Sequence, residues 1–235
     1  LTLRAVKMIS FSIIESPERV THQNRDTDPM STTIITFLDY FGVAVFAITG
    51  ALTAGHKKMD LFGVVVVALI TALGGGTLRD LMLNAHPLIW IDNPFYLLVG
   101  IVAALATFVG ARMFTMPLRM LEICDAIGLA FFPLAGLHKA MSLGHSVTIA
   151  ILMGMITGVA GGIIRDILCN EIPLIFHREI YASSALFGGL VFFALKDWNT
   201  EVALLLGAFS VLALRLMGIF WGWSMPAFRS QEESS

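Results

Sequence analysis

Two short stretches place glycines just before an arginine–aspartate pair inside long apolar segments. They are Gly74-Gly75-Gly76-Thr77-Leu78-Arg79-Asp80 and Ala160-Gly161-Gly162-Ile163-Ile164-Arg165-Asp166. Glycines weaken a helix by roughly 1 kcal/mol each relative to alanine, and a kinked or unwound segment exposes carbonyl groups that could coordinate a cation. An arginine inside an apolar span costs at least ~2.5 kcal/mol unless it is paired or hydrated. This combination, present twice, favours a permeation path through a membrane.

The candidate site residues are glycines and charged side chains. The candidate kink or pore residues are Gly74, Gly75, Gly76, Gly161 and Gly162. The candidate pore-charge or substrate-binding residues are Arg79, Asp80, Arg165 and Asp166, with Arg215 (as a counter-ion or gate) and Lys139 as weaker candidates.

The partner of Arg79 is expected on another helix, or to be water in a pore. Its neighbour Asp80 is adjacent in sequence, but adjacent helix positions point about 100° apart. Asp39 and Asp125 open two of the apolar segments, where a carboxylate suits a helix N-terminus. A structural alternative stands beside the permeation path: glycine pairs also permit close helix packing, and an arginine near a helix end can reach the headgroups.

The composition indicates an integral membrane protein. Hydrophobic residues make up 57% of the 235 residues and charged residues only 14%, against about 25% in soluble domains. A net charge of −2 without a basic patch argues against a nucleic-acid partner. Cys124 and Cys169 have no CxxC spacing, so neither a metal site nor a cofactor is expected. No HExxH, GxSxG or phosphate-loop pattern occurs, so an enzyme is not expected.

The apolar segments predict an all-α membrane protein with seven transmembrane helices. Each approximates the ~20 residues that cross ~30 Å of hydrocarbon. A polar tail, 1–33, precedes them, and a C-terminal tail, 224–235, follows. The segments are 34–54, 61–84, 95–115, 124–143, 147–170, 180–196 and 201–223.

A gapless offset of 86 residues relates the two halves of the chain. It aligns Asp39 with Asp125, Gly75-Gly76 with Gly161-Gly162, and Arg79-Asp80 with Arg165-Asp166. The predicted repeats are 34–115 (helices 1–3) and 120–197 (helices 4–6), with 201–223 as helix 7. Because each repeat holds three spans, an odd number, the second is inverted. Two inverted three-helix repeats are typical of transport proteins, whose sites lie at the repeat interface.

With these motifs, the chain resembles the prokaryotic TRIC family of trimeric intracellular cation channels. It equally resembles the bacterial inner-membrane glycine transporters of the same superfamily. The resemblance implies a homotrimer with a pore in each protomer, lined by the kinked second and fifth helices and passing K⁺, Na⁺ or another monovalent cation. A transporter of glycine or a similarly small amino acid, with Arg79 or Arg165 meeting the carboxylate, is the alternative. A structural membrane protein without transport is a third hypothesis.

The expected location is the lipid bilayer of the bacterial inner (plasma) membrane. Basic residues are more frequent in the loops on one side, which favours an N-terminus outside and a C-terminus in the cytoplasm. The residues on the predicted cytoplasmic side are Lys57, Lys58, Arg112, Arg119, Arg178 and Arg229.

Overall fold

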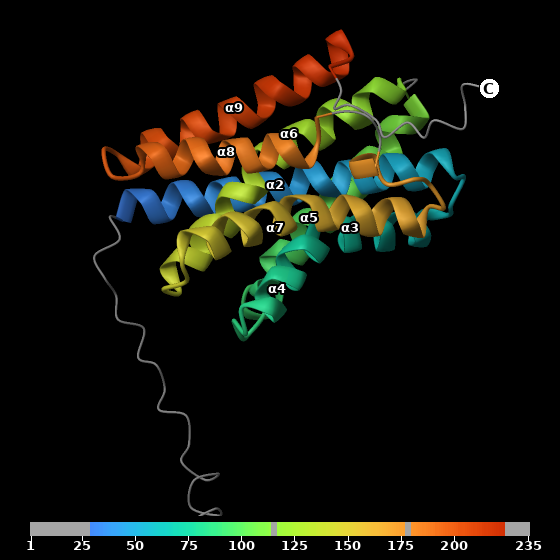
Figure 1. Cartoon of the computed structure of the whole chain (residues 1–235). Coiled ribbons are helices and arrows are strands. Elements are labelled where there is room, and N and C mark those ends of the chain that lie inside the picture. Colours follow the sequence, from blue (N-terminus) through green and yellow to red (C-terminus); the bar gives the residue numbers. More distant parts are fainter. Residues whose placement is uncertain (1–28, 114–116, 177–179, 224–235) are drawn as a thin grey trace, which may run out of the picture. The chain divides into compact units, whose positions relative to one another are not determined.

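The computed structural model describes residues 29–113, 117–176 and 180–223, and the packed helices belong to the unit Ile34–Ser235. Within these ranges the chain forms helices and loops and no strand, as Figure 1 shows. The expectation of an all-α fold is therefore confirmed for the described residues. The C-terminal tail and most of the N-terminal tail lie outside them.

The helices follow the order of the apolar segments. Six of those described are long and apolar enough to cross a membrane, which makes the protein a multi-pass membrane protein. The elements are α2 (Pro29–His56), α3 (Leu61–Met82), α4 (Ile89–Asp92), α5 (Phe95–Met113), α6 (Leu118–Ser142), α7 (Val147–Leu168), η1 (Leu174–Phe176), α8 (Ala182–Leu195) and α9 (Thr200–Trp221).

Helix α8 departs from the expected length. It has 14 residues, or about 21 Å at 1.5 Å per residue, and so falls short of the ~20 residues that a span needs. The described residues thus contain six long spans and one short apolar helix, where the sequence predicts seven spans.

Polar side chains fix two helix starts. The Asp60 side chain accepts a hydrogen bond from the backbone N–H of Gly63 at 2.8 Å, and α3 begins at the next residue, Leu61. The Asn199 side chain accepts one from the N–H of Val202 at 3.0 Å at the start of α9. Both bonds satisfy an N–H group that has no partner within the helix.

Helices α2 and α6 pack through reciprocal glycine–phenylalanine contacts. The Phe46 and Phe132 rings stack with centroids 5.0 Å apart and an interplanar angle of 20°. A Cβ atom on Gly42 would lie 3.3 Å from the Phe132 ring, and one on Gly128 would lie 3.0 Å from the Phe46 ring. Each ring therefore occupies the space left by a glycine of the opposite helix.

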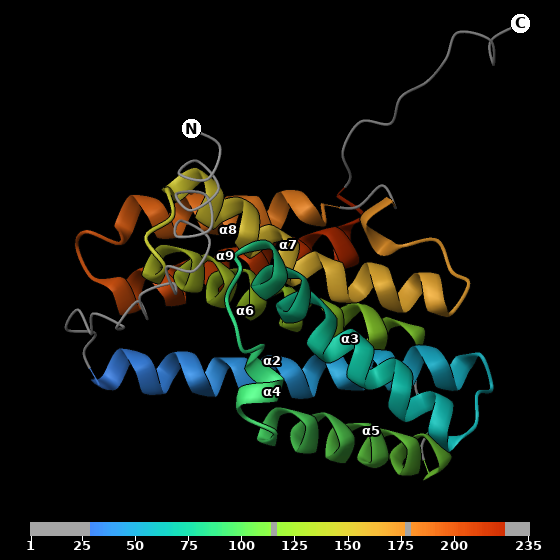
Figure 2. The same ribbon diagram turned by 90° about the horizontal axis from the view of Figure 1, so that it is seen from below.

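Helices α3 and α7 cross backbone to backbone. They run in opposite directions in both ribbon views (Figures 1 and 2). A Cβ atom on Gly75 would overlap the carbonyl oxygen of Thr157, and one on Gly161 would overlap the carbonyl oxygen of Thr71. These two contacts are again reciprocal, so the glycine in each helix is required by the close approach of the other.

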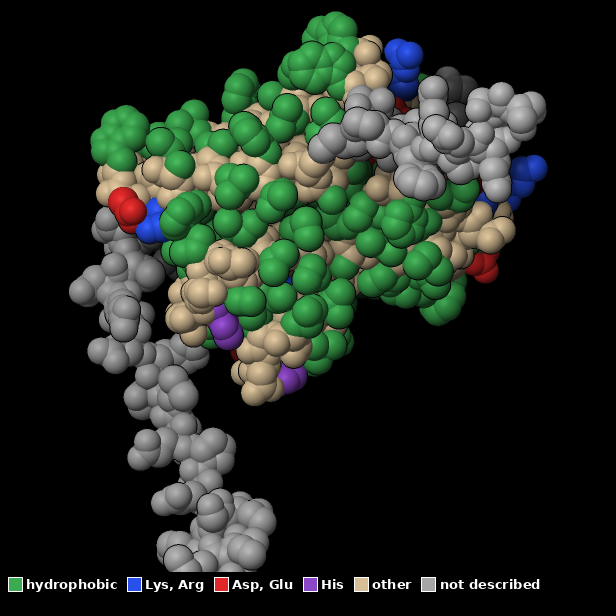
Figure 3. Space-filling view, in the orientation of Figure 1, with side chains coloured by type: hydrophobic (Ala, Val, Ile, Leu, Met, Phe, Trp, Pro, Cys, Tyr) green, Lys and Arg blue, Asp and Glu red, His purple; other side chains and the backbone are tan. Residues whose placement is uncertain are grey.

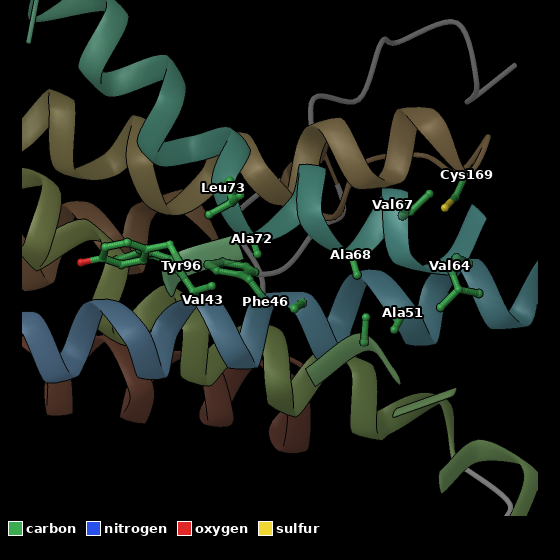
Figure 4. Packing of buried hydrophobic residues seen from close by; sticks show 14 residues of the cluster. Val43, Phe46, Ala51, Val64, Val67, Ala68, Ala72, Leu73, Tyr96 and Cys169 are labelled. Carbon is green, nitrogen blue, oxygen red and sulfur yellow. The ribbon is translucent and has the colours of Figure 1, made fainter. Parts of the chain in front are cut away.

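The largest apolar cluster joins α2, α3 and α5. Figure 4 shows Phe46 of α2 facing Ala72 of α3, with Tyr96 of α5 beside Val43. In the same view the ribbon of α3 turns near Leu73, although α3 stays helical from Leu61 to Met82. The glycine triplet thus follows a bend without interrupting the helix.

Apolar side chains also cover much of the outer surface. Figure 3 shows them along the sides of the helices, with charged side chains gathered toward the helix ends on the visible face. Phe62, Phe209 and Trp221 are each more than two thirds exposed. An exposed apolar surface of this extent suits contact with lipid rather than with water.

Candidate functional site

The carboxylate of Asp80 is the centre of a first charged cluster, which we call the Asp80 cluster (Arg79, Asp80 and Lys139). Its Oδ1 atom accepts a hydrogen bond from Arg79 Nε at 2.8 Å and lies 2.9 Å from Lys139 Nζ. Its Oδ2 atom accepts a hydrogen bond from the backbone N–H of Ile89 at 3.3 Å. Asp80 is 0% exposed and Arg79 is 3% exposed. One buried carboxylate therefore joins α3, α6 and α4.

A second cluster, which we call the Arg165 cluster (Asp125, Arg165 and Asp166), is centred on a guanidinium instead. Arg165 Nη1 donates to Asp125 Oδ1 at 2.8 Å, and Arg165 Nε donates to Asp166 Oδ1 at 2.7 Å. The second oxygen of Asp166 accepts a hydrogen bond from the N–H of Leu174 at 3.0 Å. Asp125 and Arg165 are both 0% exposed. Arg165 therefore links α7 to α6, and Asp166 links α7 to the first residue of η1.

Arg79 pairs with its neighbour Asp80, so the expectation that its partner lies on another helix is wrong. Although adjacent side chains leave a helix in different directions, the arginine chain is long and flexible enough to turn its Nε atom back onto the neighbouring carboxylate. Arg165 makes the same contact with Asp166 and also reaches Asp125 on α6. A partner on another helix thus exists for the second arginine only, among the ion pairs of the described residues.

The sequence predicts that Asp39 and Asp125 stand at the start of their helices, and this prediction is wrong. Helix α2 begins at Pro29 and α6 at Leu118, so both aspartates lie well inside. Each helix begins before the predicted apolar segment, because the polar residues that precede the aspartate lower the local hydropathy without ending the helix. Asp125 bonds Arg165, whereas Asp39 lines a small cavity.

That cavity lies between α2, α3 and α5, and Ile89 of α4 and Phe132 of α6 also line it. It has a volume of about 20 Å³, which is room for roughly one water molecule. Asp39 and Arg79 both line it, together with Gly76, Tyr96 and Ile89. No hydrogen bond or ion pair joins Asp39 to Arg79 in the described part of the chain, in contrast to the bonded Asp125 and Arg165.

The glycines of the two motifs have separate roles in packing. Gly75 and Gly161 form the α3–α7 crossing described above. A Cβ atom on Gly76 would lie 3.7 Å from Arg79 Nη2, and a Cβ atom on Gly162 would lie 3.7 Å from Arg165 Nη2. The second glycine of each pair therefore borders the guanidinium of its own helix. For Gly74, the nearest atom to such a Cβ is Ile164 Cδ1, at 3.2 Å.

Arg215 of α9 lies beside the Arg165 cluster. It is 0% exposed, its Cζ atom lies 4.7 Å from the centre of the Tyr181 ring, and its Nη1 lies 3.5 Å from the Ile180 carbonyl oxygen. The Tyr181 hydroxyl would lie 3.1 Å from a Cβ atom on Gly162. Sequence reasoning missed Tyr181 and the pairing of Asp125 with Arg165. One signal in the sequence could have indicated this pairing: the offset of 86 residues aligns Asp39 with Asp125, so both halves have an aspartate at the same position.

Two atoms of the Arg165 cluster lack a hydrogen-bond partner among the described residues, namely Asp125 Oδ2 and Arg165 Nη2. The contact between these side chains uses one oxygen and one terminal nitrogen only. The described residues contain no group of histidines, cysteines and carboxylates that could hold a metal ion. The site is therefore a set of buried ion pairs around a helix crossing.

These features define a class: multi-pass helical membrane proteins with paired charged clusters at a glycine crossing. The model of the glycine transporter family matches residues 36–112 and, separately, residues 122–197. The chain belongs to this family, whose description is that of a transporter rather than of an enzyme.

Relatives and solved structures agree with this assignment. A UPF0126 membrane protein of Vibrio cholerae is 44% identical over 85% of this chain and 84% of its own. The UPF0126 inner membrane protein YadS of Escherichia coli K12 is 42% identical, over 85% and 98%. The TRIC orthologue from Rhodobacter sphaeroides has a TM-score of 0.78 and 40% identity, over 81% of this chain and 100% of that one. A prokaryotic TRIC channel in 0.5 M KCl has a TM-score of 0.78 and 31% identity, over 83% and 100%. The resemblance to the TRIC family is confirmed.

Proposed function

We propose that the protein is a channel for monovalent cations, K⁺ first among them, with one path in each protomer. The observation that carries this proposal is the similarity to the TRIC channel structures over nearly their whole length, at 31–40% identity. The path runs beside the glycines of α3 and α7 (Gly74, Gly75, Gly76, Gly161 and Gly162), between the Asp80 cluster and the Arg165 cluster.

Two inverted three-helix repeats form the framework of this proposal. The reciprocal contacts of Phe46 with Gly128 and of Phe132 with Gly42 support a two-fold relation, as do those of Gly75 and Gly161 at the α3–α7 crossing. The double match of one family model supports it independently. In this arrangement α2, α3 and α5 form the first repeat, α6, α7 and the short α8 form the second, and α9 is the seventh helix.

On this proposal, the described arrangement is closed at the α3–α7 crossing. At the α3–α7 crossing there is no space for even a methyl group beside Gly75 or Gly161, so no ion can pass directly between the two backbones. If the ion path includes this crossing, conduction requires the helices to separate or to bend further near these residues, where glycine makes bending inexpensive.

The proposed assembly is a homotrimer in the bacterial inner membrane, with the N-terminus outside and the C-terminus in the cytoplasm. The trimeric description of the TRIC relatives supports the assembly, and the name of the Escherichia coli relative supports the location. The excess of basic residues in the loops at Lys57, Lys58 and Arg112 supports the orientation.

Recordings from the full-length protein in planar bilayers test the channel. With K⁺ on both sides, we expect unitary currents that reverse at the K⁺ equilibrium potential when a gradient is applied. Empty liposomes fused in the same way are the control. Protein that is folded and monodisperse, yet passes no unitary current in repeated fusions, would contradict the proposal.

Transport of glycine or a similarly small amino acid is the second candidate. Two observations favour it: the family description, and the cavity lined by Asp39 and Arg79, which carry the charges complementary to an amino acid. Counterflow of labelled glycine into glycine-loaded liposomes tests it. A structural membrane protein, the third hypothesis, predicts neither current nor counterflow.

A further inference from the structure

We infer that a groove between the ends of α2 and α5 binds one acidic phospholipid, with the lipid phosphate at Arg112 and an acyl chain along the apolar walls. We call it the α2–α5 groove, and its lining includes Leu52, Gly55, His56, Thr107, Phe108 and Arg112. No residue of the Asp80 cluster or of the Arg165 cluster lines it, so the inference is independent of the channel and of glycine transport.

The first argument is the size and position of the groove. Its volume is about 500 Å³, within the range of roughly 300–1,000 Å³ that is common for ligand pockets. Gly55, His56 and Arg112 line it and are exposed, so the groove opens at the surface. From Met113, at the end of α5, it extends inward to Thr107, which is about 9 Å along the helix. This depth suits a molecule with its head at the membrane surface and its chain in the hydrocarbon.

The second argument is the apolar character of the deep part. Ala51 and Leu52 of α2 are buried there, and Phe108 of α5 forms part of the wall. Thr107 is also buried, but its hydroxyl donates a hydrogen bond to the Ala103 carbonyl oxygen of its own helix at 2.8 Å. An acyl chain needs no hydrogen bond and gains from burial against such walls.

The third argument is the positive charge at the open end. The Arg112 guanidinium lies 4.5 Å from the centre of the Phe108 ring, and this cation–π contact holds it against the wall. Arg112 takes part in none of the ion pairs between described residues, and none of the described residues that line the groove is acidic. A planar guanidinium binds phosphate oxygens through two parallel N–H···O bonds, so Arg112 suits a lipid phosphate.

The charged residues next to the groove do not occupy Arg112. Lys57 Nζ lies 2.5 Å from Glu171 Oε1, and the Asp60 side chain accepts a hydrogen bond from the Gly63 N–H. Both carboxylates thus have partners of their own. In the proposed orientation this end of the groove faces the cytoplasm, where acidic lipids give the membrane surface a negative potential. The charge of the groove therefore complements an acidic lipid of that leaflet.

The helix ends themselves do not favour an anion. Helix α2 ends at His56 and α5 at Met113, so the carbonyl ends of both helices, which carry partial negative charge, lie at the open end. Binding of the phosphate therefore depends on the side chain of Arg112, and this dependence makes the substitution tests below decisive.

Lipid binding by the unmodified full-length protein, freed of lipid in detergent, is the first test. Native mass spectrometry would count the lipids retained as dioleoylphosphatidylglycerol or dioleoylphosphatidylcholine is titrated. We expect one tightly bound phosphatidylglycerol per chain, with an affinity about fivefold or more above that of phosphatidylcholine, because basic residues favour a lipid with net negative charge. sn-Glycerol 3-phosphate, which has no acyl chain, should not displace it. Equal affinities for the two lipids, or displacement by glycerol phosphate, would overturn the inference.

Arg112→Gln tests the phosphate contact. This substitution should weaken the binding of phosphatidylglycerol by about tenfold or more, because a charge-assisted contact is lost. Arg119→Gln is the matched control, since Arg119 is exposed near the start of α6 and does not line the groove. It should leave the affinity within about twofold. Equal weakening by both substitutions would mean that general surface charge holds the lipid, and would overturn the site.

Gly55→Phe tests the apolar part of the groove. A Cβ atom on Gly55 would meet nothing within 4 Å, so a phenyl ring has space to enter the groove. We expect the lipid affinity to fall by about tenfold, whereas Gly55→Ala, which leaves most of the volume open, should retain it. Thermal unfolding in the same detergent would show that each variant is folded.

Two outcomes of the Gly55→Phe experiment would contradict the inference. Unchanged lipid affinity in the folded variant would overturn the assignment to this groove. A changed number of chains per particle, together with the lost lipid, would mean that a second copy of the chain occupies the groove instead.

Discussion

The two buried arginines differ in how their aspartates are shared. In the Asp80 cluster one carboxylate receives two cations, Arg79 at 2.8 Å and Lys139 at 2.9 Å. In the Arg165 cluster one guanidinium serves two carboxylates, Asp125 and Asp166. Removing one partner of a buried ion pair costs about 3–5 kcal/mol when the other is left uncompensated. The two arginines should therefore respond differently to the same substitution.

We expect Arg165→Gln to destabilise the fold much more than Arg79→Gln. Arg165 is the cation that pairs with both Asp125 and Asp166 among the described residues. Its removal leaves both carboxylates unpaired and should lower the free energy of unfolding by about 3–5 kcal/mol. Without Arg79, Asp80 still has Lys139. Thermal unfolding of both variants in the same detergent, with the unmodified protein as reference, measures the difference. Equal decreases in unfolding temperature for the two variants would contradict the different pairing of the two arginines.

Gly75→Ala and Gly76→Ala form a second matched pair. The new Cβ at residue 75 would overlap the Thr157 carbonyl oxygen, so α3 and α7 must move apart, and overpacking of this kind costs about 1–3 kcal/mol or more. At residue 76 the nearest atom is Arg79 Nη2, at 3.7 Å, which is an ordinary contact. We expect a lower unfolding temperature for Gly75→Ala and little change for Gly76→Ala.

Gly55→Ala is the control for that pair, since a Cβ atom there meets nothing within 4 Å. It should unfold at the temperature of the unmodified protein. A stable Gly75→Ala variant would mean that the helices do not cross closely at this point.

At the scale of helices, the long apolar elements follow from the sequence and the polar contacts between them do not. Helices α3 and α7 begin at Leu61 and Val147, as expected, because uninterrupted apolar runs start there. Their ends fall two residues earlier than predicted, before turns in which Asn84 and Asn170 adopt φ values of 50° and 52°. The bond between Asp125 and Arg165 joins residues far apart in sequence, which local patterns do not reveal.

Helix α6 carries a charge that α2 lacks at the related position. Lys139 stands 86 residues after Thr53, and the Thr53 hydroxyl bonds its own helix, at the Thr49 carbonyl oxygen, 2.8 Å away. The second half thus supplies a lysine that pairs with Asp80 of the first half. The first half has the neutral Thr53 at the position that corresponds to this lysine.

We expect Lys139→Gln to raise the K⁺ conductance by about twofold or more, because the neighbourhood of Asp39, Arg79 and Asp80 would then carry a net negative charge that concentrates cations. Single-channel recording measures this. Lys196→Gln is the control, since Lys196 pairs with the exposed Asp197 near the end of α8. A conductance that stays the same or falls would place Lys139 away from the ion path.

At the scale of the whole molecule, the inverted arrangement predicts where the loops lie. The α2–α3 loop should face the cytoplasm and the α6–α7 loop the outside. Lys58→Cys and His145→Cys place a thiol in each loop. In intact cells, we expect a membrane-impermeant maleimide to label His145→Cys but not Lys58→Cys, which should react only after permeabilisation.

The unmodified protein is the background for that labelling. Burial raises the pKa of the Cys169 thiol, which keeps it protonated and slow to react near neutral pH. Labelling of both loops from the same side would contradict the inverted arrangement.

Native mass spectrometry of the protein in detergent should give particles of three chains. The number three comes from the TRIC relatives rather than from a contact in this chain, since exposed apolar residues such as Phe62 and Phe209 do not by themselves specify a subunit interface. A monomer or dimer under mild extraction would contradict the proposed assembly.

The adjacency of each arginine to its aspartate also has a consequence for biosynthesis. Arg79 and Arg165 each have a counter-ion on the very next residue, so we expect α3 and α7 each to enter the bilayer with the arginine already paired. An unpaired arginine would cost at least ~2.5 kcal/mol during insertion. Helix α3 therefore needs no help from Lys139, which the ribosome adds only after two further helices have been made. Each half can be inserted in the order of synthesis, and the contacts between halves form afterwards.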